Sequence, residues 1–387
     1  MYTVGVIAEY NPFHKGHDFQ LQEIRRQFPD ACIVVVMSGN IVQRGEFAIL
    51  DKWQRAQMAL ESQADLIIEL PLWASLQSAD HFSYWAIDLL SRLGVDHFIF
   101  GTHRIDKLSI EKALSWLSQN QVKLDEHVQR FLAQGFAYPA AMQAAIDVLD
   151  SNRQHVTFNM SEGNSLLGYQ YIKANASLKD PMTFDVIARN TDYHSGSQIR
   201  QKILASENIE QLVPSYTYRE FTKSLPTHWQ NYFYLLKYQI LSKSKEELRA
   251  IQGMKEGFEW RLKKVIHQAK DFEELVNLLT SKRWARSSVQ RLLMNILLNL
   301  TQATWQTHIQ NYQMQGYVRI LGFKDRGKQF LNARESHCSN LIVFSNLTQK
   351  IFDGYALMIH VDEIFQLGHQ QISTQNIGRF PIFLSKY

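Results

Sequence analysis

The chain has 387 residues, of which 45% are hydrophobic, 12% aromatic and 20% charged. This composition is typical of a folded globular protein and excludes a largely disordered chain, while the length favours two or three domains over one. No apolar run reaches the roughly 20 residues of a membrane-spanning helix. The N-terminal segment carries the acidic Glu9 and lacks the basic-then-apolar pattern of a secretory signal, so we expect no such signal. We therefore expect a cytoplasmic protein that does not associate with membranes.

The cysteine content points to the same compartment. The chain has two cysteines, Cys32 and Cys338, which lie far apart in the sequence. Two distant cysteines form neither a disulfide framework nor a metal site, and they fit a reducing environment. We therefore predict no bound structural metal.

The first half of the chain alternates short apolar runs with helical patterns. The apolar runs predict buried strands at 3–8, 32–37, 65–70, 97–101 and 184–188. Helical spacing predicts helices over 15–28, 51–60, 79–93 and 197–204. Such alternation is typical of an α/β fold, in which a parallel Rossmann-like sheet binds its ligand at the carboxyl ends of the strands. Residues 104–160 lack a strong strand pattern, so we expect a helical insertion there.

The pattern changes after Pro214. Long helical patterns cover 228–243, 256–270, 271–280 and 285–302, and short strands are expected at 318–321 and 341–344. We therefore predict two domains: a parallel-sheet domain over residues 1–205 and a mainly helical domain over residues 206–387.

Charge is divided unevenly between these halves. Residues 1–200 carry 17 Lys and Arg against 22 Asp and Glu, a net charge of −5, whereas residues 201–387 carry 24 against 15, a net charge of +9. A basic half beside an acidic half suggests an acidic partner such as nucleic acid, although basic surfaces also occur without a ligand.

The first predicted strand leads directly into His14-Lys15-Gly16-His17, where a helix is expected to begin. A helix N-terminus at the end of a parallel strand offers free N–H groups and a positive dipole to a phosphate, and a glycine allows close approach. Two histidines three residues apart lie on one face of the first turn and can both donate to phosphate oxygens. We therefore predict that His14 and His17 serve phosphate chemistry, stabilising charge at the α-phosphate during nucleotidylyl transfer.

Other interpretations of this string remain open. Read alone, His-x-Gly-His is more often structural, and a zinc pair is a rival, although zinc histidines on a helix are usually four residues apart and need a third ligand. The chain contains neither a Gly-x-x-x-x-Gly-Lys-Ser/Thr sequence nor Gly-x-Gly-x-x-Gly, which removes the usual P-loop and dinucleotide motifs.

Asn11-Pro12-Phe13-His14-Lys15-Gly16-His17 resembles the signature of the nucleotidylyltransferase superfamily with the HUP fold. Further ordered runs resemble the bacterial tRNA(Met) cytidine acetate ligase family. These runs are 38–46, 51–56, 65–71, 100–101, 163–168, 187–189 and 195–200, with a weaker similarity over 282–293. The sequence departs from the family pattern at Asp18-Phe19-Gln20, Phe47, Thr102-His103 and Gly163, and none of these departures falls on His14 or His17.

The resemblance implies a two-step reaction. ATP, expected with Mg²⁺, and acetate would form acetyl-adenylate, and the acetyl group would then pass to N4 of the wobble cytidine of elongator tRNA(Met). No protein partner is implied. The residues that the resemblance and the strand ends assign to ATP are Ile7, Ala8, Glu9, Tyr10, Asn11, Pro12, Phe13, His14, Lys15, Gly16, His17, Asp18, Phe19, Gln20, Gly101, Asn164, Arg189 and Ser197.

Basic residues supply candidates for tRNA binding. Arg44 lies in a glycine-bounded loop that could close over the site, or could be an ordinary solvated loop residue. Lys282, Arg283, Arg286 and Arg291 surround a predicted helix start, and such charges can follow a phosphodiester backbone. Two alternatives remain: an adenylyltransferase that makes a small dinucleotide-type cofactor, and a non-catalytic RNA-binding relative.

Overall fold

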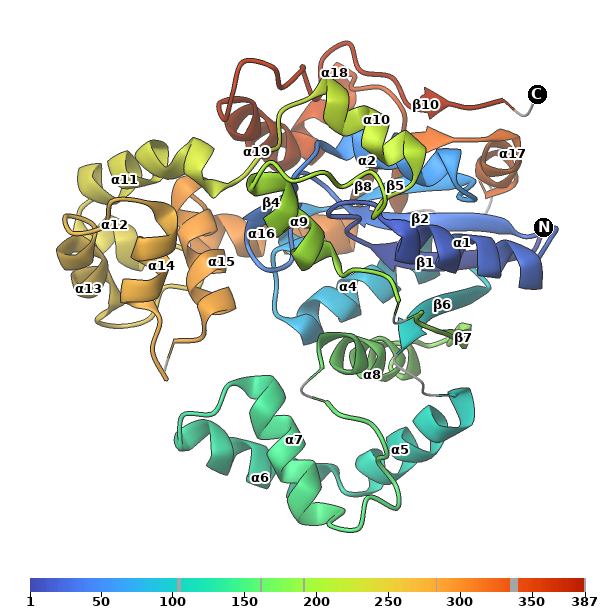
Figure 1. Ribbon diagram of the computed structural model, residues 1–387, viewed down its shortest axis with the longest axis horizontal. Coiled ribbons are helices and arrows are strands. Elements are labelled where there is room, and N and C mark those ends of the chain that lie inside the picture. The colour runs from blue at the N-terminus through green and yellow to red at the C-terminus, as the bar shows by residue number, and fades with distance from the viewer. Residues whose placement is uncertain (103–105, 161, 191, 283, 335–339, 386–387) are drawn as a thin grey trace.

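The computed structural model describes all residues except 103–105, 161, 191, 283, 335–339 and 386–387 (Figure 1). Its centre is a sheet with the strand order β10-β8-β5-β2-β1-β6-β7, and β9 pairs with β8. The strands of this sheet are β1 Thr3–Ala8, β2 Cys32–Ser38, β5 Leu66–Leu70, β6 His97–Thr102, β7 Thr183–Ala188, β8 Gly316–Phe323, β9 Leu341–Phe344 and β10 Ile382–Phe383. The predicted Rossmann-like α/β class is confirmed, because β1, β2, β5, β6 and β7 are all parallel to one another.

Helices cover both faces of the sheet. They are α1 Lys15–Gln27, α2 Lys52–Glu61, α3 Leu72–Ser75, α4 Ala79–Arg92, α8 Gly163–Ala176, α9 Gly196–Leu204, α10 Ser215–Lys223, α16 Gln302–Met314, α17 Asp325–Arg334, α18 Gln349–Phe352 and α19 Ala356–Gln366. Alternate residues of each strand face opposite sides, so Val35 packs in the core beneath α1 and α2, while Val34 and Val36 pack in the core that contains α4. This burial on both faces explains why the inner strands appear in the sequence as continuous apolar runs.

Two helical bodies project from the sheet (Figure 1). The insertion consists of α5 Lys107–Gln119, α6 Gln121–Ala133 and α7 Tyr138–Leu149. The other body contains α11 Phe233–Ser242, α12 Lys245–Arg249, α13 Phe258–Val265, α14 Phe272–Leu279 and α15 Arg286–Leu297. The helix expected over 256–270 is shorter than predicted: it begins only at Phe258, because Gly257 has a positive φ of 82°, and it already ends at Val265.

The sheet includes strands from both sides of the expected boundary at residue 205. β8 pairs antiparallel with β5, and both β9 and β10 pair parallel with β8. The segment from residue 316 onward therefore completes the sheet of the first 205 residues, and the helical body between them contributes no strand among its described residues. The two-domain division itself stays a prediction.

A buried ion cluster fixes this late segment to the early one. The ammonium of Lys52, on α2, lies 2.9 Å from both carboxylate oxygens of Glu69 and 2.6 Å from Oδ2 of Asp362 on α19. Asn40 donates to the second Asp362 oxygen at 2.8 Å. All four side chains are buried, so the C-terminal segment supports the loop that follows β2. Among the described residues, no helix is long and apolar enough to cross a membrane.

Candidate active site

The carboxyl end of β1 forms the centre of the candidate site. The chain leaves β1 at Ala8, turns at Tyr10, whose φ is +49°, and enters α1 at Lys15 with His14 as the N-cap residue. Nδ1 of His14 accepts a hydrogen bond from the Gly16 N–H at 3.0 Å. Nδ1 of His17 lies 3.4 Å from the His14 nitrogen and completes a reciprocal capping box.

The two histidine rings stack with their centroids 3.7 Å apart. Because Nδ1 of His14 accepts a backbone N–H, the proton of its neutral ring lies on Nε2, which remains available as a donor. Burial, together with the positive charge of Arg189, lowers the pKa of His14 to about 4. Burial, His14 and Arg189 hold the pKa of His17 well below its usual range, opposed by a hydrogen bond with the Pro12 carbonyl. Both rings are therefore neutral at pH 7, and Nε2 of His14 is the donor left available.

A second helix N-terminus meets the same loop. Ser195 caps α9, and its hydroxyl lies 3.1 Å from that of Ser197 in the first turn. Gly196 is so close to the Asn11 carbonyl that a Cβ atom there would lie 3.0 Å from the oxygen. Nη1 of Arg200 donates to the same carbonyl at 2.7 Å. The positive ends of α1 and α9 therefore converge on residues 11–16, an arrangement suited to an anion with several phosphates.

Arg189 and Gly101 come from two neighbouring strand ends, and Asn164 comes from the start of α8. Gly101 lies in β6, and a Cβ atom on it would lie 3.3 Å from Cγ of Arg189, so a larger residue would displace that cation. The Arg189 N–H donates to the Thr102 carbonyl at 2.8 Å, which continues the β6–β7 ladder. Asn164 is in the first turn of α8, and a Cβ atom on the preceding Gly163 would lie 3.5 Å from Nη2 of Arg44.

Several residues of the expected ATP segment have other roles for their side chains. Tyr10 and Phe13 belong to the core beneath α1, and Ile7 and Ala8 pack against the cores on either side of the sheet. Asp18 accepts hydrogen bonds from Ser62 at 2.6 Å and Tyr216 at 2.8 Å, and so joins α1 to α2 and α10. These residues can reach a nucleotide through their main chain; the prediction that the whole segment contacts ATP stays a prediction.

Sequence reasoning did not single out Arg55, which organises the site from below. Its fully buried guanidinium donates to the carbonyls of Glu9 at 2.6 Å, Ser38 at 3.0 Å and Leu50 at 3.0 Å, and also to that of Gly39. Burial lowers the pKa of Arg55 to about 10, so it stays charged at pH 7. Arg55 therefore joins the carboxyl ends of β1 and β2. The only signal was its place in the run 51–56 noted for family resemblance.

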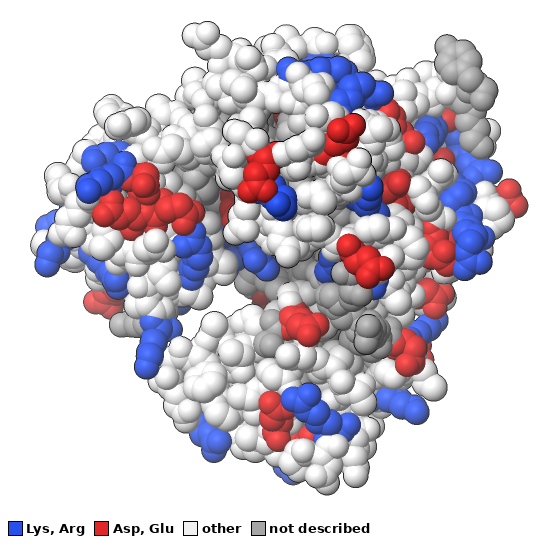
Figure 2. Space-filling view, viewed as in Figure 1, with Lys and Arg blue, Asp and Glu red and all other residues white. Residues whose placement is uncertain are grey.

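The predicted tRNA-binding residues do not form one free basic face. Arg44, in the hairpin of β3 Ile41–Val42 and β4 Glu46–Phe47, lies close to Arg291 on α15, and Arg291 also interacts with Asp80. The hairpin is packed on α15, because a Cβ atom on Gly45 would lie 2.6 Å from the Arg291 nitrogen. Figure 2 shows basic and acidic side chains interspersed over this face, with a notch between the two helical bodies.

The other candidates have separate surroundings. Arg286 is held on α14 by an ion pair with Glu273 at 2.5 Å and a hydrogen bond to Asn277 at 3.0 Å. Lys282 packs against Gly135, where the α6–α7 turn approaches the α14–α15 turn. Arg283 lies outside the described residues. Arg44 and Arg291 are thus brought together, and Arg286 is committed to a surface ion pair.

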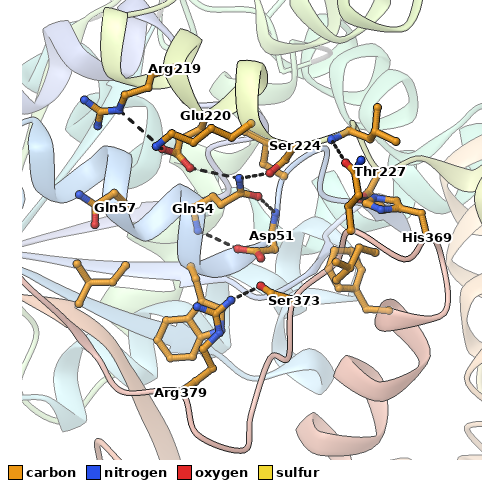
Figure 3. Close-up of a pocket in the computed structure, with 18 of the residues that line it drawn as sticks. Asp51, Gln54, Gln57, Arg219, Glu220, Ser224, Thr227, His369, Ser373 and Arg379 are labelled. Atoms are coloured by element: carbon orange, nitrogen blue, oxygen red, sulfur yellow. Dashed lines mark hydrogen bonds and ion pairs between the residues drawn. The ribbon is translucent and has the colours of Figure 1, made fainter.

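A cavity of about 440 Å³ lies away from these residues, between α2, α10 and the C-terminal segment. Figure 3 shows its polar side chains already bonded to one another, including Gln54 to Ser224 at 2.9 Å and Thr227 to His369 at 3.2 Å. It contains no residue of the predicted site. Within the described part of the chain, no group of three or more His, Cys, Asp or Glu side chains could hold a metal ion.

Comparison with known proteins gives the family. The model of the HIGH Nucleotidyl Transferase family matches residues 1–379. The tRNA(Met) cytidine acetate ligase of Streptococcus pneumoniae (strain P1031) is 34% identical over 388 residues, covering 99% of each chain. That of Latilactobacillus sakei is also 34% identical, covering 99% of this chain and 98% of its own. The chain belongs to the tRNA(Met) cytidine acetate ligase family.

Solved structures agree with this assignment at the level of the fold. Thermotoga maritima TmcAL bound with alpha-thio ATP superposes with a TM-score of 0.87 at 23% identity, and its apo form with 0.85 at 23%, each covering 100% of both chains. The matches to the tRNA(Met) cytidine acetate ligase family span the sheet, the insertion and the helical body. All three parts therefore belong to the architecture that this family shares.

Proposed function

We propose that this protein is an ATP-dependent ligase that makes acetyl-adenylate from acetate and transfers the acetyl group to N4 of the wobble cytidine of elongator tRNA(Met). The observation that carries the proposal is the convergence of the α1 and α9 N-termini on the His14–His17 pair, with Arg189 beside it. Full-length similarity to proteins named tRNA(Met) cytidine acetate ligase supports the choice of substrates. The tRNA substrate assigns the reaction to the cytoplasm.

In the first step, an acetate oxygen attacks the α-phosphorus of ATP and pyrophosphate leaves. Negative charge develops on the phosphate oxygens, and preorganised donors aimed at that charge lower the barrier. Nε2 of His14, the positive ends of α1 and α9, and the Arg189 guanidinium supply this stabilisation, and His17 orients the His14 ring by stacking on it and by completing the cap. Mg²⁺ would enter bound to the phosphates of ATP and would neutralise part of their charge.

In the second step, N4 of cytidine attacks the acetyl carbonyl and AMP leaves. An exocyclic amine of a base is a weak nucleophile, which is why an activated acyl group is needed. The base must leave the stack of the anticodon loop to reach the sheet edge. Arg44 and Arg291, which lie close together, are the proposed contacts for the RNA backbone, and Lys282 lies where the two bodies meet.

A single incubation separates this function from its alternatives. Labelled acetate, ATP and total tRNA are mixed with the protein, and the label in tRNA and in small products is followed. Acetate-dependent labelling of tRNA supports the proposal. An adenylylated small product with unlabelled tRNA would instead indicate a cofactor-forming adenylyltransferase, and absence of ATP turnover would indicate a non-catalytic RNA-binding protein.

A further inference from the structure

Glu9 is the one carboxylate at the carboxyl end of the central strand β1, five residues before His14. Its carbonyl accepts a hydrogen bond from Arg55, which fixes the main chain. Its side-chain oxygen Oε1 accepts from the Gln43 N–H at 2.7 Å, which fixes the carboxylate against the β3–β4 hairpin. Within the described part of the chain, no hydrogen bond or ion pair engages the second oxygen, Oε2.

The charged groups around Glu9 leave this carboxylate without a dedicated cation. Arg200, on α9, is committed to the Asn11 carbonyl at 2.7 Å and to Glu46 at 3.1 Å. Arg44, on the hairpin, extends toward Gly163 at the start of α8. Among the described residues, Glu46 on the hairpin, Tyr171 on α8 and Arg55 on α2 are the other titratable or charged groups that interact with it.

A half-buried anion beside a phosphate site weakens the binding of ATP, because like charges repel strongly where the local dielectric is low. A role in ATP binding therefore does not account for this side chain. A carboxylate oxygen is, however, the natural acceptor for the N4 amino group of cytosine, and it repels the O4 carbonyl that uracil carries at the same place.

We infer that Oε2 of Glu9 accepts a proton from N4 of the cytidine as that nitrogen attacks the acetyl group, an inference that rests on the proposed function. The N4–carbon bond forms and the bond between the acetyl carbon and the AMP oxygen breaks, so that AMP leaves with the electron pair. One N4 proton passes to Glu9, and the other stays on the amide nitrogen of the product. Before the reaction, the same oxygen orients the amine and selects cytosine.

The environment of Glu9 makes it a stronger base than an ordinary carboxylate. Burial raises its pKa and nearby Glu46 adds to this, while the Gln43 N–H, Arg200 and Arg44 oppose it. A base whose pKa approaches the working pH transfers protons more effectively than an ordinary carboxylate. Because Glu9 must be ionised to act, the rate of acetyl transfer should fall as pH drops through its raised pKa.

The test measures the two half-reactions separately in the full-length protein. Acetyl-adenylate formation is followed by acetate-dependent exchange of pyrophosphate into ATP, and transfer by single-turnover reaction of purified acetyl-adenylate with elongator tRNA(Met). Glu9→Gln keeps the acceptor for the Gln43 N–H but has a poor proton acceptor in place of the carboxylate. We expect transfer to fall at least about 100-fold more than exchange, the scale of a lost general base, and Glu9→Asp to restore part of it.

A variant of the neighbouring Glu46 tests the pH dependence of acetyl transfer, which would not change if Glu9 had only a structural role. Glu46→Gln removes the like charge beside Glu9 and frees Arg200, so the acid limb of the transfer rate should shift to lower pH, whereas Glu9→Gln should abolish that limb. Glu207→Gln, which disrupts a surface pair with Lys202, is the matched control. If Glu9→Gln slows exchange and transfer equally, or transfers acetyl at the wild-type rate, the inference about Glu9 is wrong while the proposed function is unaffected. A wild-type protein that makes no acetyl-adenylate, or never acetylates tRNA, would overturn the proposed function itself.

Discussion

His14 has two roles in this account, and a pair of substitutions separates them. Its Nδ1 caps α1 by accepting the Gly16 N–H, and its Nε2 is the proposed phosphate donor. His14→Ala removes both, whereas His14→Asn keeps a good N-cap acceptor and removes the phosphate donor. Loss of the cap should cost about 1 kcal/mol of folding stability in His14→Ala and only a few tenths in His14→Asn.

The catalytic loss should be the same in both variants. Removing one preorganised donor to a developing oxyanion slows reactions about 100- to 1000-fold. Acetate-dependent exchange of pyrophosphate into ATP, measured beside urea unfolding, reports the two effects independently. Exchange at the wild-type rate in His14→Asn would refute the assignment of Nε2 to the phosphate, and an unchanged unfolding free energy in His14→Ala would refute the cap.

The lowered pKa of His14 adds a pH dependence whose sign is fixed. The unfolded chain binds a proton at His14 below about pH 6.5, whereas the folded protein resists it down to about pH 4. Stability from this group is therefore complete above pH 6.5 and is lost as pH falls toward 4, by about 2 kcal/mol at pH 5. In urea unfolding at pH 5 and 7, His14→Asn should lose less stability between the two values than the wild type. An equal loss in both proteins would contradict this.

Three further substitutions test the supports of the site. Lys52→Met leaves Glu69 and Asp362 buried without their cation and should lower the free energy of unfolding, measured in urea, by about 3 to 5 kcal/mol. This loss should be smaller at low pH, where the carboxylates can be protonated. A loss under about 1 kcal/mol would be incompatible with a buried ion cluster. Gly45→Ala places a side chain at a φ of +75° and against the α15 backbone, so it should lower the free energy of unfolding by at least about 1 kcal/mol in the same assay. An unchanged free energy of unfolding would argue against this packing. Charge reversal of Arg44 together with Arg291 should weaken tRNA binding and make it less dependent on salt concentration, while the exchange of pyrophosphate into ATP is preserved. An unchanged affinity for tRNA would show that neither arginine contacts the RNA.

Local chemistry explains which features of the fold were predictable. The strands β1, β2, β5 and β6 are largely buried on both faces, so their apolar runs were visible in the sequence and, with the apolar run of the edge strand β7, predicted a parallel sheet. The antiparallel pairing of β8 with β5 joins residues about 250 positions apart. No local pattern encodes such a partner, and the sequence therefore predicted short strands near 318–321 without their place in the sheet.

At the site, too, features set by the local sequence were predictable and features set by contacts between distant residues were not. The His14–His17 motif follows a strand and opens a helix, which is a local arrangement, and it could be predicted as a phosphate site. The burial of Arg55 beneath four carbonyls and the ion pair between Arg286 and Glu273 depend on contacts between separate elements. A count of basic residues could not distinguish an arginine free to bind RNA from one already paired, so Arg286 and Arg291 looked alike in the sequence.

The most direct test of the central claim is the identity of the modified nucleoside. Purified elongator tRNA(Met) is incubated with the full-length protein, ATP and isotopically labelled acetate, digested to nucleosides and analysed by mass spectrometry, beside a transcript that carries uridine at the wobble position. We expect labelled N4-acetylcytidine from the first tRNA, none from the second, and none when ATP or acetate is omitted. Acetate consumption without labelled N4-acetylcytidine in the cytidine-containing tRNA would contradict it.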